Sequence, residues 1–132
     1  MLIAALIFAG LASVLHVYIF ALESLLWTSD RARKTFGIKS AEEAQTTKSL
    51  AYNQGFYNLF LALMGFIGIA LIASGHLAVG ATLVYAGVGS MLLAALVLVT
   101  ANAKMARAAL LQGGMPLLSV ALLTVALVSA NA

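Results

Sequence analysis

Residues 50–101 read LAYNQGFYNLFLALMGFIGIALIASGHLAVGATLVYAGVGSMLLAALVLVTA, and this stretch decides the fold. It holds two apolar runs, from about Leu50 to Ser74 and from about Ala78 to Ala101. Each run reaches the roughly 20 residues that a helix needs to cross a bilayer. Only Gly75-His76-Leu77 separates them, which predicts a tight turn. The two helices are therefore expected to be antiparallel neighbours.

Two further apolar runs flank this stretch, from about Leu2 to Trp27 and from about Ala108 to Val128. Over all 132 residues, 64 % are hydrophobic and 8 % are charged, and the mean hydropathy is +1.09. A soluble domain is about half apolar and about a quarter charged. The composition excludes a cytosolic enzyme, a nucleic-acid-binding module and a disordered tail. We predict an all-α, polytopic membrane protein: a single domain over residues 1–132, folded as an antiparallel bundle of four transmembrane helices.

The seven basic residues predict the orientation of the bundle. They fall only in the first loop, about residues 28–49, and in the third loop: Arg31, Arg33, Lys34, Lys39, Lys48, Lys104 and Arg107. In a four-span protein these two loops share one side, and loops rich in Lys and Arg face the cytoplasm. We therefore expect the chain in the plasma membrane with both termini outside.

The first loop ends in a helix start signal. Ser40-Ala-Glu-Glu43 has the pattern of a capping box, in which the Ser40 side chain accepts from the first turn and Glu43 reaches back. The second long helix is therefore expected to begin near Ala41.

Small residues at helical spacing predict where the helices touch, because association in lipid depends on close packing. Such spacings occur in three of the four spans, at Ala5, Ala9 and Ser13, at Gly65 and Gly68, and at Ala86, Ser90 and Ala94. We interpret them as contacts within the bundle, with an oligomer contact as the alternative.

The ionisable residues within the spans are candidate functional residues, since charge inside a membrane is costly. His16 and Glu23 lie seven residues apart on one face of the first helix. With Trp27 at the interface and a rise of about 1.5 Å per residue, Glu23 lies about 6 Å deep and His16 about 16 Å deep. On the second and fourth helices, Asn53, Gln54 and Gln112 fall at about the depth of Glu23, and Tyr57 and Asn58 lie one turn deeper, toward His16.

This layer predicts a polar pocket on the cytoplasmic side, lined by Glu23, His16, Asn53, Gln54, Tyr57, Asn58 and Gln112. Each residue has a simpler interpretation. Glu23 could extend to water or pair with Lys48 or Arg107. His16 could make an ordinary interhelical hydrogen bond, and the amides could hold helices together.

Several kinds of site have no signal in the sequence. There are no cysteines, and no pair of His or Glu residues has the spacing of a metal site. No nucleophile elbow or phosphate-binding loop occurs. We expect no metal, no cofactor and no nucleic-acid partner. The expected partners are membrane lipids and a small amphiphilic ligand, and a homo-oligomer is left open.

Several short sequence motifs, and the order in which they occur, resemble those of one family of small bacterial membrane proteins. They are His16-Val-Tyr-Ile-Phe-Ala-Leu-Glu23 with Trp27, Phe36-Gly37, Asn53-Gln-Gly-Phe-Tyr-Asn58, and Gln112 with Pro116. The family is domain-of-unknown-function family 1304. The resemblance covers the whole chain and implies a four-helix protein of the bacterial inner membrane, without implying a function.

Three functional hypotheses remain open from the sequence. The first is that the pocket binds or translocates a small amphiphile or protons. The second is an enzyme acting on a lipid-soluble substrate, with His16 or Glu23 as its acid or base. The third is a structural or accessory subunit in which the polar layer only holds the helices in register.

Overall fold

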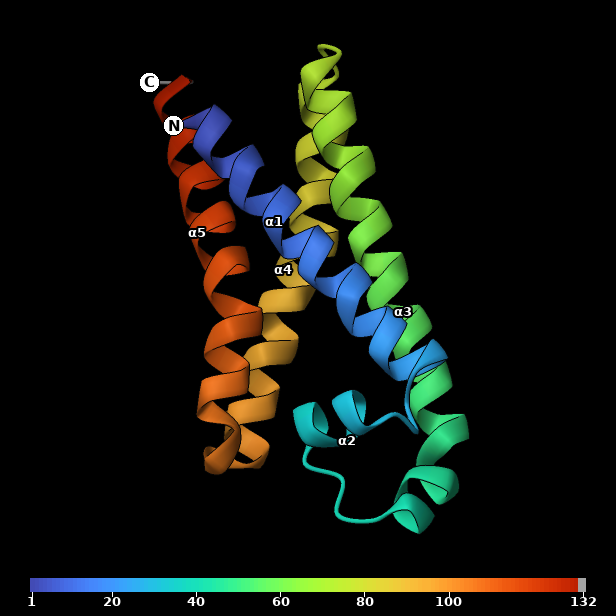
Figure 1. Cartoon of the computed structure of the whole chain (residues 1–132). Helices are drawn as coiled ribbons and strands as arrows, with labels where there is room; N and C mark the ends of the chain where they lie inside the picture. The colour runs from blue at the N-terminus through green and yellow to red at the C-terminus, as the bar shows by residue number, and fades with distance from the viewer. Residues whose placement is uncertain (131–132) are drawn as a thin grey trace.

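The computed structural model describes residues 1–130 and contains four long helices (Figure 1). They are α1 (Leu2–Phe20), α3 (Ala41–Ala73), α4 (Leu77–Ala101) and α5 (Ala106–Ala130). A π-helical turn, η1 (Ala21–Leu25), continues α1, and a 3₁₀ turn, η2 (Ala103–Met105), precedes α5. All four long helices are long and apolar enough to cross a membrane. The predicted all-α bundle of a multi-pass membrane protein is confirmed.

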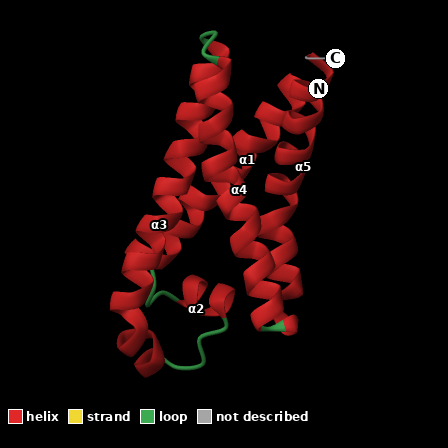
Figure 2. Ribbon diagram, turned by 180° about the vertical axis from the view of Figure 1, so that it is seen from behind, coloured by secondary structure: helices red, strands yellow, loops and turns green. Residues whose placement is uncertain are grey.

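The four helices form a ring in which α3 packs on α4, α4 on α5, and α1 crosses both α5 and α3. Both termini lie at one end, together with the turn between α3 and α4, where Gly75 takes the left-handed conformation with φ 90°. The first loop and the α4–α5 connection lie at the opposite end, which we call the loop end. Toward the loop end, the α4–α5 pair diverges from α3 (Figure 2).

The first loop is more ordered than the sequence indicated. It contains a short helix, α2 (Asp30–Phe36), which Ser29 caps by accepting a hydrogen bond from the backbone N–H of Ala32 at 3.2 Å. Gly37 ends α2 with φ 69°. The capping box at α3 forms as expected: Ser40 Oγ accepts from the N–H of Glu43 at 3.0 Å, and the Glu43 carboxylate accepts from the N–H of Lys39 at 2.8 Å.

The expected helix contacts are partly correct. Ala5, Ala9 and Ser13 are buried in the bundle, as are Gly65 and Gly68. The expectation for α4 is wrong, because Ala86 and Ala94 are exposed and Ser90 is only half-buried. The buried face of α4 carries glycines and larger apolar side chains instead: Gly80, Ala81, Val84, Gly87, Val88, Met91 and Ala95. Where α3 packs on α4, glycine backbones lie against Val and Met side chains of the other helix. The spacing of Ala and Ser therefore did not identify the buried face of α4.

Candidate functional site

Glu23 lies inside η1, where the helix widens by one residue. The backbone N–H of Leu26 bonds to the carbonyl of Ala21 at 3.0 Å, five residues back instead of four. Such π-turns are rare and frequently occur at functional sites. The Glu23 side chain is 9 % exposed, so its carboxylate is largely removed from the surroundings of the bundle.

A glycine on α3 allows the π-turn to lie directly on that helix. A Cβ atom at Gly55 would come within 3.0 Å of the backbone nitrogen of Ser24 and within 3.1 Å of Cβ of Glu23. The Ser24 hydroxyl donates to the carbonyl of Tyr52 at 2.8 Å. The contact therefore needs a residue without a side chain at position 55, and it sets the direction in which Glu23 points.

Asn58 is the hydrogen-bond partner of Glu23. Its Nδ2 donates to Oε2 of Glu23 at 2.8 Å, which joins α1 to α3 across 35 residues of sequence. Asn58 Nδ2 also lies 3.3 Å from the carbonyl of Gln54 on its own helix. Within residues 1–130 the one ion pair joins Arg33 to Asp30, so neither Lys48 nor Arg107 pairs with Glu23 there.

The other polar residues predicted on α3 do not join this contact. The side chains of Asn53, Gln54 and Tyr57 are exposed and form no hydrogen bond with Glu23. At about 100° per residue, positions 53 and 57 lie almost opposite Gly55 on the helix. Depth alone had grouped these residues, whereas the glycine face decides which of them reach η1.

His16 is 2 % exposed, deep among the helices. Its Nδ1 is 2.9 Å from the carbonyl of Ala12, one turn back on its own helix. The partner is therefore the backbone of α1 and not another helix. The neighbouring Ser13 hydroxyl is fully buried and is without a hydrogen-bond partner in the described part of the chain. The face of α1 that enters the bundle is thus polar at two depths, at His16 with Ser13 and at Glu23.

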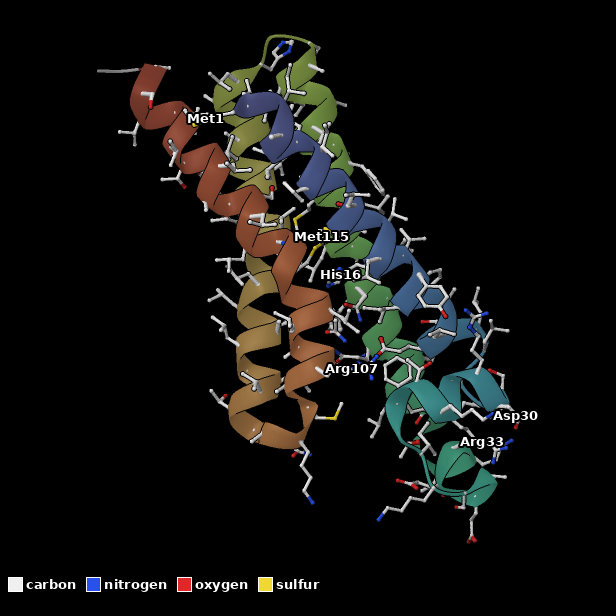
Figure 3. All side chains as sticks on the ribbon, turned by 60° about the vertical axis from the view of Figure 1, so that its left-hand side comes forward. Met1, His16, Asp30, Arg33, Arg107 and Met115 are labelled. Carbon is white, nitrogen blue, oxygen red and sulfur yellow. The ribbon has the colours of Figure 1, made fainter. Side chains whose placement is uncertain are left out.

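Gln112 lies half-buried on α5, outside the contact that Glu23 makes with Asn58. The η1 turn packs mainly on α3, while α5 meets α1 nearer the terminal end, where the Ser119 hydroxyl donates to the carbonyl of Ala5 at 2.9 Å. Figure 3 shows the labelled His16 between α1 and α5 and the labelled Arg107 on α5 toward the loop end. The structure thus brings Asn58 to Glu23 and leaves Gln112 on a different helix pair.

Trp27 connects the site to the first loop. Its Nε1 donates to the hydroxyl of Thr47 at 3.1 Å, and its ring lies 5.2 Å from that of Phe36. Arg31 folds back along α1: its Nε donates to the hydroxyl of Tyr18 at 2.8 Å, and its guanidinium lies 5.5 Å from the ring centre. These contacts hold α2 at the loop end, where it lies beside the first part of α3, on the side of the α4–α5 pair (Figure 2).

One acid of the first loop has a shifted pKa. The Arg33 guanidinium hydrogen-bonds to Asp30, and this contact holds the pKa of that carboxyl below its ordinary value of 3.8.

Within residues 1–130 no group of three or more His, Cys, Asp or Glu side chains comes together. The chemistry that the site offers is therefore that of one buried carboxylate with an amide donor.

Sequence reasoning missed the two residues that place Glu23, namely Ser24 and Gly55. A signal was present in the sequence. Gly55 directly follows the polar pair Asn53-Gln54, and Ser24 directly follows the only acid of the first span. Their pairing depends on the rotation of two helices about their axes, which the sequence of either helix does not specify.

Comparison with protein families gives a match. A family model described as "Protein of unknown function (DUF1304)" matches residues 10–124, a range that includes every residue of the contact described above. No curated protein and no solved structure matches the chain.

Proposed function

The chain belongs to the DUF1304 family, and we propose that it binds a small amphiphile through Glu23 on the cytoplasmic side of the bacterial plasma membrane. The observation that carries this proposal is the hydrogen bond from Asn58 on α3 to Glu23, a buried carboxylate within a π-turn. A carboxylate within a span is costly and is a functional candidate for that reason. A bundle that needed only packing here would do as well with an apolar residue.

The chemistry of the ligand follows from the unused capacity of the carboxylate. An ionised carboxylate has about four acceptor positions on its two oxygens. Asn58 occupies one position on Oε2, and no described residue donates to Oε1. A cationic or hydroxyl-bearing headgroup is therefore the favoured partner. The apolar remainder of the ligand would extend from this headgroup into the hydrocarbon layer.

Proton exchange is a second candidate, and His16 is the observation that favours it. The Nδ1 contact with Ala12 leaves Nε2 of the ring outside any hydrogen bond of the described residues. His16 lies seven residues from Glu23, about 10 Å along the helix axis at a rise of about 1.5 Å per residue. A water or ligand between them would be needed to pass a proton.

The cytoplasmic assignment of the site rests on the basic residues. The loop end carries all seven Lys and Arg residues, whereas the opposite end carries both termini and the Gly75 turn. By the positive-inside rule, the loop end faces the cytoplasm and the termini face outward. Glu23 would then lie within the cytoplasmic leaflet.

The test is the substitution Glu23→Gln, which removes the charge and keeps the shape of the side chain. The matched control is Glu42→Gln, an exposed acid in the first turn of α3. Both variants and the unaltered protein are purified with native lipid, and retained small molecules are identified by mass spectrometry. We expect Glu23→Gln to lose one class of amphiphile at least tenfold, while Glu42→Gln keeps it.

Circular dichroism and thermal unfolding separate binding from folding. A Glu23→Gln protein that unfolds earlier yet retains the same molecules would overturn the proposal, as would an unaltered protein that retains no amphiphile. For proton exchange, vesicles containing the protein and a pH-sensitive dye should show a flux that both Glu23→Gln and His16→Gln abolish. An unchanged flux in either variant rejects that candidate.

A further inference from the structure

A second feature of the molecule is an apolar groove of about 230 Å³ between α4 and α5, near the loop end. Its walls are Leu96 and Val99 on α4 and Leu110, Gly114 and Leu117 on α5, with small side chains between them. It shares no residue with the Glu23–Asn58 contact, which lies on α1 and α3. The groove is therefore separate from the Glu23 site.

The groove exists because the two helices touch at one level and leave space beside it. A Cβ atom at Gly113 would come within 2.8 Å of Cβ of Ala95, so the helices are in close contact there. The next residue, Gly114, is different: no atom lies within 4 Å of the Cβ it could carry. This open position forms part of the groove wall, and any side chain placed there would extend into the space.

Two cations flank, in sequence, the groove residue nearest the loop end, Ala106. Arg107 and Lys104 are exposed, and the connection from residue 101 to 108 contains no acid. Arg107, Leu110 and Gly114 are spaced by three and then four residues, so they share one face of α5. Figure 3 shows Arg107 on the part of α5 nearest the loop end. On this face of α5, Arg107 therefore precedes two residues of the groove wall, Leu110 and Gly114, toward the membrane centre.

We infer that this groove binds one anionic phospholipid of the loop-end leaflet, with an acyl chain in the groove and its phosphate on Arg107 and Lys104. The arrangement matches such a lipid in order and polarity: charge at the interface, then a hydrocarbon-lined channel toward the membrane centre. Guanidinium groups bind phosphate through paired, charge-assisted hydrogen bonds. Basic residues near a membrane surface also attract anionic headgroups in general. The groove adds to that attraction a place for the chain.

Gly114→Leu is the decisive variant, because the added side chain meets no atom at Cβ and fills the groove. Gly89→Leu is the matched control: Gly89 lies on α4, also has no atom within 4 Å of an added Cβ, and is not part of the groove. Each protein is placed in vesicles of phosphatidylcholine with a minor share of phosphatidylglycerol, extracted in mild detergent, and weighed intact by native mass spectrometry.

We expect the unaltered protein and Gly89→Leu to retain one phosphatidylglycerol, and Gly114→Leu to retain at least tenfold less. Arg107→Gln should keep a bound lipid but lose the preference for phosphatidylglycerol over phosphatidylcholine, whereas Lys48→Gln on α3 should not. Inorganic phosphate at millimolar concentration should not displace the lipid. Displacement by phosphate alone would show a headgroup site without a chain site.

Equal retention by Gly114→Leu and the unaltered protein would overturn the inference. A change of oligomeric mass in Gly114→Leu, with lipid unaffected, would overturn it in favour of a second copy of the chain seated in the groove. Because Gly114→Leu leaves Glu23 and Asn58 intact, the amphiphile attributed to Glu23 should stay bound to this variant. The two proposals therefore fail independently.

Discussion

The seam between α3 and α4 is formed by close glycine contacts, whereas the seam between η1 and α3 adds side-chain hydrogen bonds to a glycine contact. At the first, glycine backbones lie against the opposite helix: a Cβ atom at Gly68 would come within 2.8 Å of the carbonyl oxygen of Gly80, and one at Gly87 within 2.8 Å of that of Leu61. At the second, side chains form hydrogen bonds, from Ser24 to Tyr52 and from Asn58 to Glu23. The two seams meet on α3, at different depths.

The difference shows which contacts packing alone can explain. Helices in lipid associate through close approach of small residues and through interhelical hydrogen bonds. The α3–α4 seam achieves its approach with glycines and needs no buried charge. The η1–α3 seam also has its glycine, at position 55, and carries a carboxylate in addition. The carboxylate is therefore more than packing requires, which is why we assign function to this seam.

Breaking the glycine seam should have the largest effect on stability. In Gly68→Ala the new methyl group would meet the backbone of α4 at the Gly80 carbonyl, and backbone atoms cannot rotate away. We expect a loss of about 3 kcal/mol in the free energy of unfolding, at the upper end of the usual cost of overpacking. Gly89→Ala, with open space around its Cβ, should lose nothing. Denaturant titration in detergent micelles measures both, and equal effects would show that the close approach is not what stabilises this seam.

Breaking the polar seam should cost less and should depend on Glu23. Asn58→Leu removes the donor to Oε2, and we expect a loss of about 1 kcal/mol in the free energy of unfolding, within the range measured for hydrogen bonds between membrane helices. When both partners become apolar, in Glu23→Leu with Asn58→Leu, most of that loss should disappear, because no polar group is left unpaired. The same titration run as a double-mutant cycle gives the coupling. Additive losses would mean that the two side chains do not interact.

The smallest effect is expected at Ser24, beside the π-turn. Ser24→Ala removes the hydrogen bond to the Tyr52 carbonyl and keeps the Cβ atom that lies against α3. The average interhelical hydrogen bond in a membrane contributes about 0.6 kcal/mol, and we expect a loss of that size. Ser49→Ala, at an exposed serine on α3, is the control. A loss as large as that of Gly68→Ala would show that the hydroxyl, and not Gly55, positions the turn.

Much of the fold follows from simple features of the chain. The four apolar runs, the Gly75 turn and the Ser40 capping box appear in the structure where the sequence placed them. Depth along the helices placed Asn53 and Gln54 level with Glu23 and Asn58 one turn deeper, toward His16, whereas in the structure Asn58 is the residue that bonds to Glu23. The same reasoning wrongly assigned the contact face of α4 to Ala86, Ser90 and Ala94, because small residues also occur on surfaces that face lipid. It also missed α2, although Ser29 and Gly37 bound that helix locally, and it missed the π-turn, which lies against Gly55 of α3.

The sequence by itself determined that this protein is a four-helix membrane bundle, because hydrophobic run length and the positions of charges set which segments enter a bilayer. Only the tertiary structure decided which side chains meet. Each helix is free to rotate about its axis until glycine faces find their partners, and that rotation turned Asn58 toward Glu23 while it left Asn53 and Tyr57 exposed. Rotation depends on the shape of two surfaces at once, whereas depth depends on one helix alone.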